Sequence, residues 1–107
     1  MTILAPAPIG ETDTLTVTTV RLTGEIDIFT SHALRQRLMR ALPTGADLLV
    51  VDLSAVSFCD ASGLGVLVGI QRRARPRGVT LTLKAPRPLM ARLLRITGLD
   101  RSLTVVP

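Results

Sequence analysis

The stretch VVDLSAVSFCDASGLG, residues 50–65, decides the fold of this chain. Its first part is a run of apolar residues typical of a buried strand, and its last part predicts a helix that opens at Ser62. Asp60 lies between them in a short turn. Open α/β sheets place their working surface where a strand ends and a helix begins. The polar residues at this junction are therefore the first candidates for a functional site.

Strand and helix patterns precede this stretch. Residues 15–22 alternate between apolar and polar and predict a half-buried strand, with a bulge at Thr18-Thr19 and a turn over 24–27. Leucines four residues apart predict a helix over 31–42, capped by Thr30 or Ser31 and stopped by residues 43–45. The nearly continuous apolar run over 48–53 predicts a central parallel strand covered on both faces.

The same alternation follows it. A helix is expected over 62–75 and a strand over 79–83. A further helix follows Pro88, with Leu89, Leu93 and Ile96 on one side and Gly98 after its end. Residues 103–106 form a last short strand or a tail.

Alternating strands and helices predict βαβ units and a mostly parallel sheet in a single α/β domain. The domain spans residues 1–107, with 1–13 as a loose lead-in or an edge strand near Ile3-Leu4. In such units the strand-to-helix loops emerge at one edge of the sheet. Asp27, Phe29 and Thr30 should therefore lie close to the loop that begins at Asp60.

Composition limits the class of protein and the cellular compartment that we expect. The chain has 107 residues, 47% of them hydrophobic, which suits one packed core. No apolar run reaches the roughly 20 residues of a membrane span, and no signal peptide is expected. One cysteine, Cys59, cannot form an internal disulfide and is expected to be a small buried hydrophobe. We therefore expect a cytoplasmic protein.

The charge is basic but does not favour a nucleic-acid partner. The net charge is +5, with most acidic residues at or before Asp60 and most basic ones from Arg72 onward. The arginines are spread along predicted helices, and only two aromatic residues, Phe29 and Phe58, could stack on bases. An acidic protein partner, or no specific charged partner, fits this pattern better.

The residues with catalytic potential form no recognisable active site. His32 is the single histidine, and no set of side chains has metal-ligand spacing. Gly63-Leu64-Gly65 lacks the lysine of a phosphate loop and the third glycine of a dinucleotide fingerprint, so we read its glycines as close helix–strand packing. We expect no cofactor, no metal and no catalytic residue, and interpret the chain as a binding or signalling module.

Three segments resemble a known family. Residues 22–27 (LTGEID), 60–65 (DASGLG) and 96–99 (ITGL) resemble the STAS domain, and more closely the bacterial anti-sigma factor antagonists, in matching order and spacing. The resemblance implies a mixed, mostly parallel sheet of four to five strands, with three to four helices mainly on one side.

The resemblance also implies a partner. Such antagonists bind an anti-sigma factor that is a serine kinase, and so free a sigma factor; the kinase phosphorylates the antagonist, and a serine phosphatase resets it. The implied partner-binding residues are Asp27, Phe29, Thr30, Asp60, Ala61, Ser62, Gly63 and Leu64.

One position departs from the family pattern. The pattern has a hydroxyl residue directly after the aspartate as the phosphoacceptor, and here that residue is Ala61. Ser62 is then the candidate acceptor, or it only caps the helix. Two further hypotheses stay open: an accessory STAS subunit of another assembly, such as a lipid transporter, without phosphoregulation, and a small enzyme or nucleotide-binding protein.

Overall fold

The computed structural model describes residues 15–42 and 47–107. In chain order its elements are β1 (Val17–Ile26), α1 (Ser31–Ala41), β2 (Leu48–Cys59), α2 (Ala61–Ala74), the 3-10 turn η2 (Arg75–Arg77), β3 (Thr80–Lys84), α3 (Pro88–Ile96), α4 (Leu99–Ser102) and β4 (Thr104–Val106). The expected edge strand at Ile3-Leu4 and the helix stop at 43–45 lie outside the described residues.

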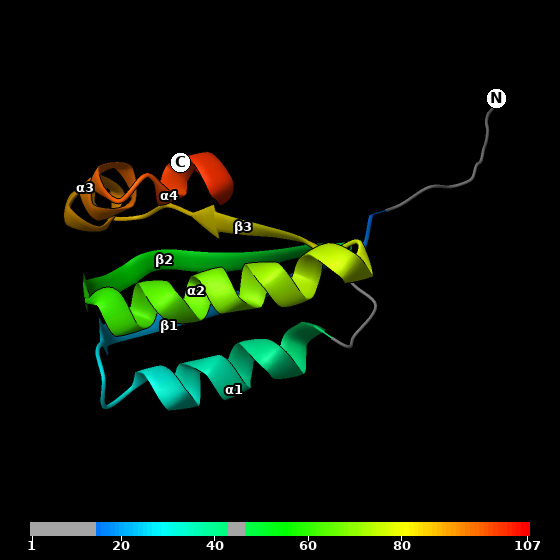
Figure 1. Ribbon diagram of the computed structural model, residues 1–107, viewed down its shortest axis with the longest axis horizontal. Helices are drawn as coiled ribbons and strands as arrows, with labels where there is room; N and C mark the ends of the chain where they lie inside the picture. The colour runs from blue at the N-terminus through cyan, green and yellow to red at the C-terminus, as the bar shows by residue number, and fades with distance from the viewer. Residues whose placement is uncertain (1–14, 43–46) are drawn as a thin grey trace, which may run out of the picture.

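The four strands form one sheet in the order β1-β2-β3-β4, and every neighbouring pair is parallel. Helix α1 packs against β1 and α2, and α2 packs against β2 and β3. Figure 1 shows the β1–α1 loop and the start of α2 at the same end of the molecule. The predicted small α/β domain with a parallel sheet is confirmed, and its strand-to-helix loops share one edge.

The first two strands extend further than the sequence predicts. β1 continues through Ile26, where a turn over 24–27 was expected, and β2 continues to Cys59. Ile26 and Cys59 are partners in the strand register and both are buried. The pairing of β1 with β2 therefore continues up to the buried pair Ile26 and Cys59. The loops begin directly after these two residues.

The bulge expected at Thr18-Thr19 is wrong. These two residues pair regularly with Leu49 and Val50, and the register shifts lie further along β1, between Arg21 and Thr23 and between Gly24 and Glu25. Gly24 has a φ of 78°, which favours glycine because it has no Cβ. One register shift of β1 thus lies at the glycine that can adopt a positive φ.

One face of the sheet is fully buried, and the other is buried only in part, at Thr82. Leu49, Val51 and Leu53 of β2 are fully buried in one cluster with the inner faces of α1 and α2. The alternate residues Val50 and Asp52 are only half-buried. The expectation of a strand covered on both faces is therefore wrong, because an apolar run does not show which of its faces receives a helix.

Charges on the second face explain why it stays open. Asp52 is paired in register with Arg21 on β1 and with Lys84 on β3. A hydrogen bond from the Ser54 backbone amide (2.9 Å) is the main cause that lowers the pKa of Asp52, and both cations act in the same direction. A row of charges of this kind is costly to cover with apolar side chains.

The apolar stripe of Leu89, Leu93 and Ile96 is not the buried face of α3, although Leu93 is half-buried. Met90 and Leu94 are its buried residues, whereas Leu89 is 54% and Ile96 is 68% exposed. Ala85, with a φ of 54°, redirects the chain as it leaves β3, and its amide donates to the Val106 carbonyl (2.9 Å). The connections of α3 to β3 and β4 thus decide which side of the helix faces the core. The helical period of its apolar residues does not contain this information.

The end of α3 and the last strand agree with expectation. Gly98 follows α3 with a φ of 75°, the left-handed conformation of a glycine helix end. α4 begins at once, and β4 then pairs with β3 at the edge of the sheet.

The first two glycines of α2, Gly63 and Gly65, have different surroundings. A Cβ built on Gly63 would lie 2.6 Å from Cys59 Sγ and 2.6 Å from Ile26 Cγ2, whereas one on Gly65 would meet nothing within 4 Å. The expectation of close helix–strand packing is confirmed for Gly63 and is wrong for Gly65. Only at Gly63 does the first turn of α2 press on the ends of β1 and β2.

We predict opposite effects of alanine at these two glycines. Gly63→Ala should lower the free energy of unfolding by about 1–3 kcal/mol, because the new methyl group overpacks a closed contact. Gly65→Ala should leave it unchanged or raise it by up to about 1 kcal/mol through helix propensity. Urea unfolding followed by circular dichroism measures both. Equal stabilities of the two variants would contradict the contact.

Candidate functional site

The β1–α1 and β2–α2 loops lie side by side at the carboxyl edge of the sheet. The Asp60 amide donates to the Ile26 carbonyl (3.0 Å), which ties the start of α2 to the end of β1. The edge therefore brings together Asp27, Phe29 and Thr30 from one loop with Asp60 and the residues after it from the other. We call this surface, residues 25–31 and 58–66, the docking edge.

Asp60 caps α2. Its Oδ1 accepts hydrogen bonds from the amides of Ser62 (2.9 Å) and Gly63 (3.3 Å), and from the Ser62 hydroxyl. The helix therefore opens at Ala61 behind an aspartate cap, and the expectation that it opens at Ser62, or is capped by it, is wrong. The hydrogen bond from the Ser62 side chain is the main cause that lowers the pKa of Asp60, and the amides add to it.

The β1–α1 loop is held by a reciprocal pair of side chains. Asp27 Oδ1 accepts from the amides of Phe29 (2.9 Å) and Thr30 (3.1 Å). Thr30 Oγ1 accepts from the Asp27 amide (2.9 Å) and donates to the Glu25 carbonyl (3.1 Å). Asp27 and Thr30 thus fix the backbone of the loop that carries Phe29.

This fixed loop exposes large apolar side chains. Phe29 is 90% and Ile28 is 70% exposed, and Phe58 at the end of β2 is 44% exposed. Phe58 is paired with Glu25 across the strands, so all three side chains belong to the docking edge. Exposed apolar side chains on neighbouring loops make this edge a candidate for a protein interaction site.

The sequence indicated the two loops, 25–31 and 58–66, but did not single out Ile28 and Phe58 within them. A signal for Phe58 was present, because the two aromatic residues of the chain, Phe29 and Phe58, both fall at this edge.

The other candidates differ in how they can contribute. Ala61 is exposed and Ser62 is half-buried, so both present atoms at the surface. Gly63 and Leu64 are buried, so they shape the edge from beneath and offer a partner no side chain.

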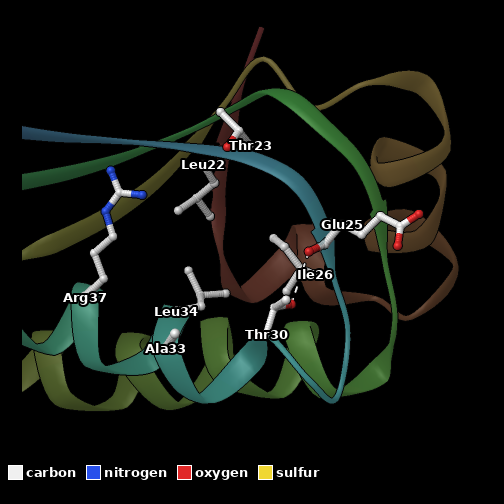
Figure 2. A pocket seen from close by; sticks show the side chains of 8 residues that line it. All are labelled: Leu22, Thr23, Glu25, Ile26, Thr30, Ala33, Leu34 and Arg37. Carbon is white, nitrogen blue, oxygen red and sulfur yellow. Dashed lines mark hydrogen bonds between the residues drawn. The ribbon is translucent and has the colours of Figure 1, made fainter.

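A groove continues from the docking edge between β1 and α1, with a volume of about 200 Å³. Figure 2 shows its lining residues: Leu22, Thr23, Glu25, Ile26, Thr30, Ala33, Leu34 and Arg37. Its wall is largely aliphatic, and the carboxylate of Glu25 points away from it. Thr30 belongs both to the groove and to the docking edge.

Within residues 15–42 and 47–107, no group of three His, Cys, Asp or Glu side chains is placed to hold a metal ion. His32 is exposed in the first turn of α1. Cys59 is buried, and this burial raises the pKa of its thiol to about 11. No helix in the described part of the chain has the length and apolar character needed to cross a membrane.

We predict that Asp60 contributes to the acid sensitivity of the fold. The folded-state pKa of Asp60 lies below the ordinary value of 3.8. The ionised carboxylate therefore stabilises the fold fully above that value, and this stabilisation is lost as the pH falls through the folded pKa. Asp60→Asn keeps a capping side chain without the charge, so its stability should fall less between about pH 5 and pH 2. Urea midpoints measured across this range test the difference. Parallel curves for the variant and the wild type would contradict it.

Comparisons with known proteins agree with this architecture. The model of the family described as "Mlab, STAS domain" matches residues 9–107. The anti-sigma-B factor antagonist of Bacillus subtilis is 39% identical over 80 residues, covering 75% of this chain and 72% of that protein.

Two solved structures extend the likeness. A crystal structure of an anti-sigma factor antagonist from Mycobacterium paratuberculosis has a TM-score of 0.75 at 31% identity, covering 90% of this chain and 81% of that one. The Bacillus cell fate determinant SpoIIAA, in its phosphorylated form, has a TM-score of 0.65 at 26% identity, covering 91% and 88%. With its parallel sheet and its capped α2, the chain belongs to the STAS domain family.

Proposed function

We propose that this protein is an anti-sigma factor antagonist, which binds an anti-sigma factor with serine kinase activity through the docking edge and so frees a sigma factor. The names of its relatives support the role. The observation that carries it is the exposure of Phe29, Ile28 and Phe58 on loops held by hydrogen bonds. Exposed aromatic side chains on a rigid scaffold are typical anchors of a protein interface.

Phosphorylation of Ser62 is the finer part of this proposal. Ser62 is the one hydroxyl residue in the first turn of α2, and a phosphoserine carries about −1.5 to −2 charges at neutral pH. The amino end of a helix tolerates this charge. A partner packed against the same edge, close to Asp60 and Asp27, would meet repulsion and the desolvation of a phosphate, so phosphorylation should end the complex.

The setting of Ser62 limits its reactivity. Its hydroxyl donates to Asp60 and it is half-buried, whereas Ala61, one residue earlier, is exposed. A kinase must break the hydrogen bond to Asp60 before Ser62 can react. We therefore infer that Ser62 is phosphorylated slowly, and more slowly than a serine at position 61 would be.

Ala61 also favours a second candidate function, an accessory STAS subunit of another assembly such as a lipid transporter. Such a subunit needs the docking edge but no phosphoacceptor. Copurification with transporter subunits, and no binding to any anti-sigma factor of the source organism, would support this alternative.

We predict that Phe29→Ser weakens binding to the cognate anti-sigma factor about tenfold or more, because truncation of a central aromatic anchor commonly costs at least this much. Titration calorimetry with the anti-sigma factors of the source organism measures the affinity. Leu15→Ser is the matched control, since Leu15 is also exposed but precedes β1 at the opposite edge of the sheet. Equal losses in both variants, with both folded, would refute the docking edge.

We predict a phosphorylation order as well. Incubated with the kinase and ATP, the wild type should gain one phosphate on Ser62, Ser62→Ala should gain none, and Ala61→Ser should react faster than the wild type. Intact-mass spectrometry with site mapping follows all three. A phosphate on Ser62→Ala would place the acceptor elsewhere, and a wild type as fast as Ala61→Ser would contradict the hindrance by Asp60.

A further inference from the structure

A second groove lies between the last turns of α2 and the short helix α4, with a volume of about 320 Å³. Its lining residues are Val68, Gln71, Arg72, Arg75, Leu99, Ser102 and Leu103. Gln71 Nε2 donates to the Ser102 carbonyl (3.1 Å), which holds α4 against α2. The groove is larger than the one beside the docking edge, and it uses none of the docking-edge residues.

Leu99, the last residue of the segment 96–99, forms one wall of this groove together with Ser102 and Leu103. Gly98, with a φ of 75°, ends α3 and lets α4 start immediately. Leu99 thereby lies half-buried opposite α2 and lines the groove. One of the three family-like segments of the chain is thus used to shape a hollow away from the partner-binding loops.

The groove combines an aliphatic interior with cationic residues. Val68 and Leu99 are half-buried and Leu103 is buried, while Arg72 and Arg75 are exposed. Among the described residues, no carboxylate lines it. Neither guanidinium makes an ion pair within residues 15–42 and 47–107. Two unpaired arginines beside an apolar wall are complementary to a ligand that is anionic at one end and apolar along its length.

Arg75 also faces a neighbouring hollow of about 210 Å³, which it shares with Gln71, Gly78, Val79 and Thr80. Arg75 and Gln71 therefore stand between two hollows that continue along the end of α2.

The lining argues against a nucleotide. A nucleobase is commonly held by stacking on an aromatic side chain, and neither groove wall contains one. Both phenylalanines of the chain lie at the docking edge instead. Aliphatic side chains of leucine and valine suit an alkyl chain.

We propose that the α2–α4 groove binds a soluble single-chain amphiphile, an alkyl chain with a phosphate or carboxylate head. The alkyl chain lies against Val68, Leu99 and Leu103, and Arg72 and Arg75 bind the head. This site is separate from the docking edge and does not depend on the antagonist role.

The test uses n-octyl phosphate as the probe, kept below its micelle concentration, with the full chain labelled with ¹⁵N. Backbone amide shifts should move along residues 68–75 and 99–103 and stay unchanged over 25–31. Inorganic phosphate and octyl glucoside, which carry the head charge or the alkyl chain alone, should each bind at least tenfold more weakly.

Two double variants with the same change in charge make the test specific. R72Q/R75Q should raise the dissociation constant for octyl phosphate at least tenfold, because hydrogen bonds to a charged head are lost. R73Q/R77Q is the control: both arginines are exposed in the same run but do not line the groove, so it should bind as the wild type does. Urea midpoints confirm that both variants are folded.

Three outcomes would overturn the proposal. Equal losses in the two double variants would mean attraction by net charge without a site. Inorganic phosphate binding as tightly as octyl phosphate would mean that the apolar wall takes no part. Binding to vesicles of anionic phospholipid, but none to octyl phosphate, would make the surface a membrane contact.

Discussion

Asp60 makes the contacts on which the rest of this structure depends. Its amide closes the junction between β2 and β1 through the Ile26 carbonyl, and its carboxylate caps α2 through the amides of Ser62 and Gly63. One residue therefore places a helix against two parallel strands and holds both loops of the docking edge in place. Gly63 completes this arrangement, because only glycine lets the first turn of α2 approach Cys59 and Ile26 so closely.

The docking edge joins a rigid base to exposed apolar side chains. Phe29 gains almost nothing from burial in the isolated protein, since 90% of it is exposed. Asp27 and Thr30 nevertheless hold its backbone in one conformation. Much of the conformational entropy that a partner would otherwise have to remove is thus already lost on folding, which favours tight binding by a small surface.

The sequence predicted most of the architecture but not how the elements face one another. Strand and helix order followed from hydrophobic period, and Asp60 does lie between a strand and a helix, as predicted. The orientation of α3 did not follow, because Leu89 and Leu93 have the same four-residue spacing as the buried pair Met90 and Leu94. Tertiary connections decide which stripe is covered, and these depend on the turn at Ala85.

Single-sequence reasoning also misjudged the ends of elements. The extension of β1 to Ile26 depends on pairing with Cys59 in a strand that lies far away in the sequence. For the same reason Asp60, and not Ser62, became the cap, since β2 ends one residue before it. The register of distant strands is therefore the information that a local pattern lacks.

The buried position of Cys59 provides a chemical probe of local opening at the docking edge. Its thiol lies beneath the first turn of α2, so close that a Cβ atom at Gly63 would touch it. Burial raises the pKa of the thiol to about 11. A thiol of this kind reacts with an alkylating reagent only when that turn lifts from the sheet. The rate of alkylation under native conditions would therefore give the free energy of local opening at the docking edge, separately from global unfolding.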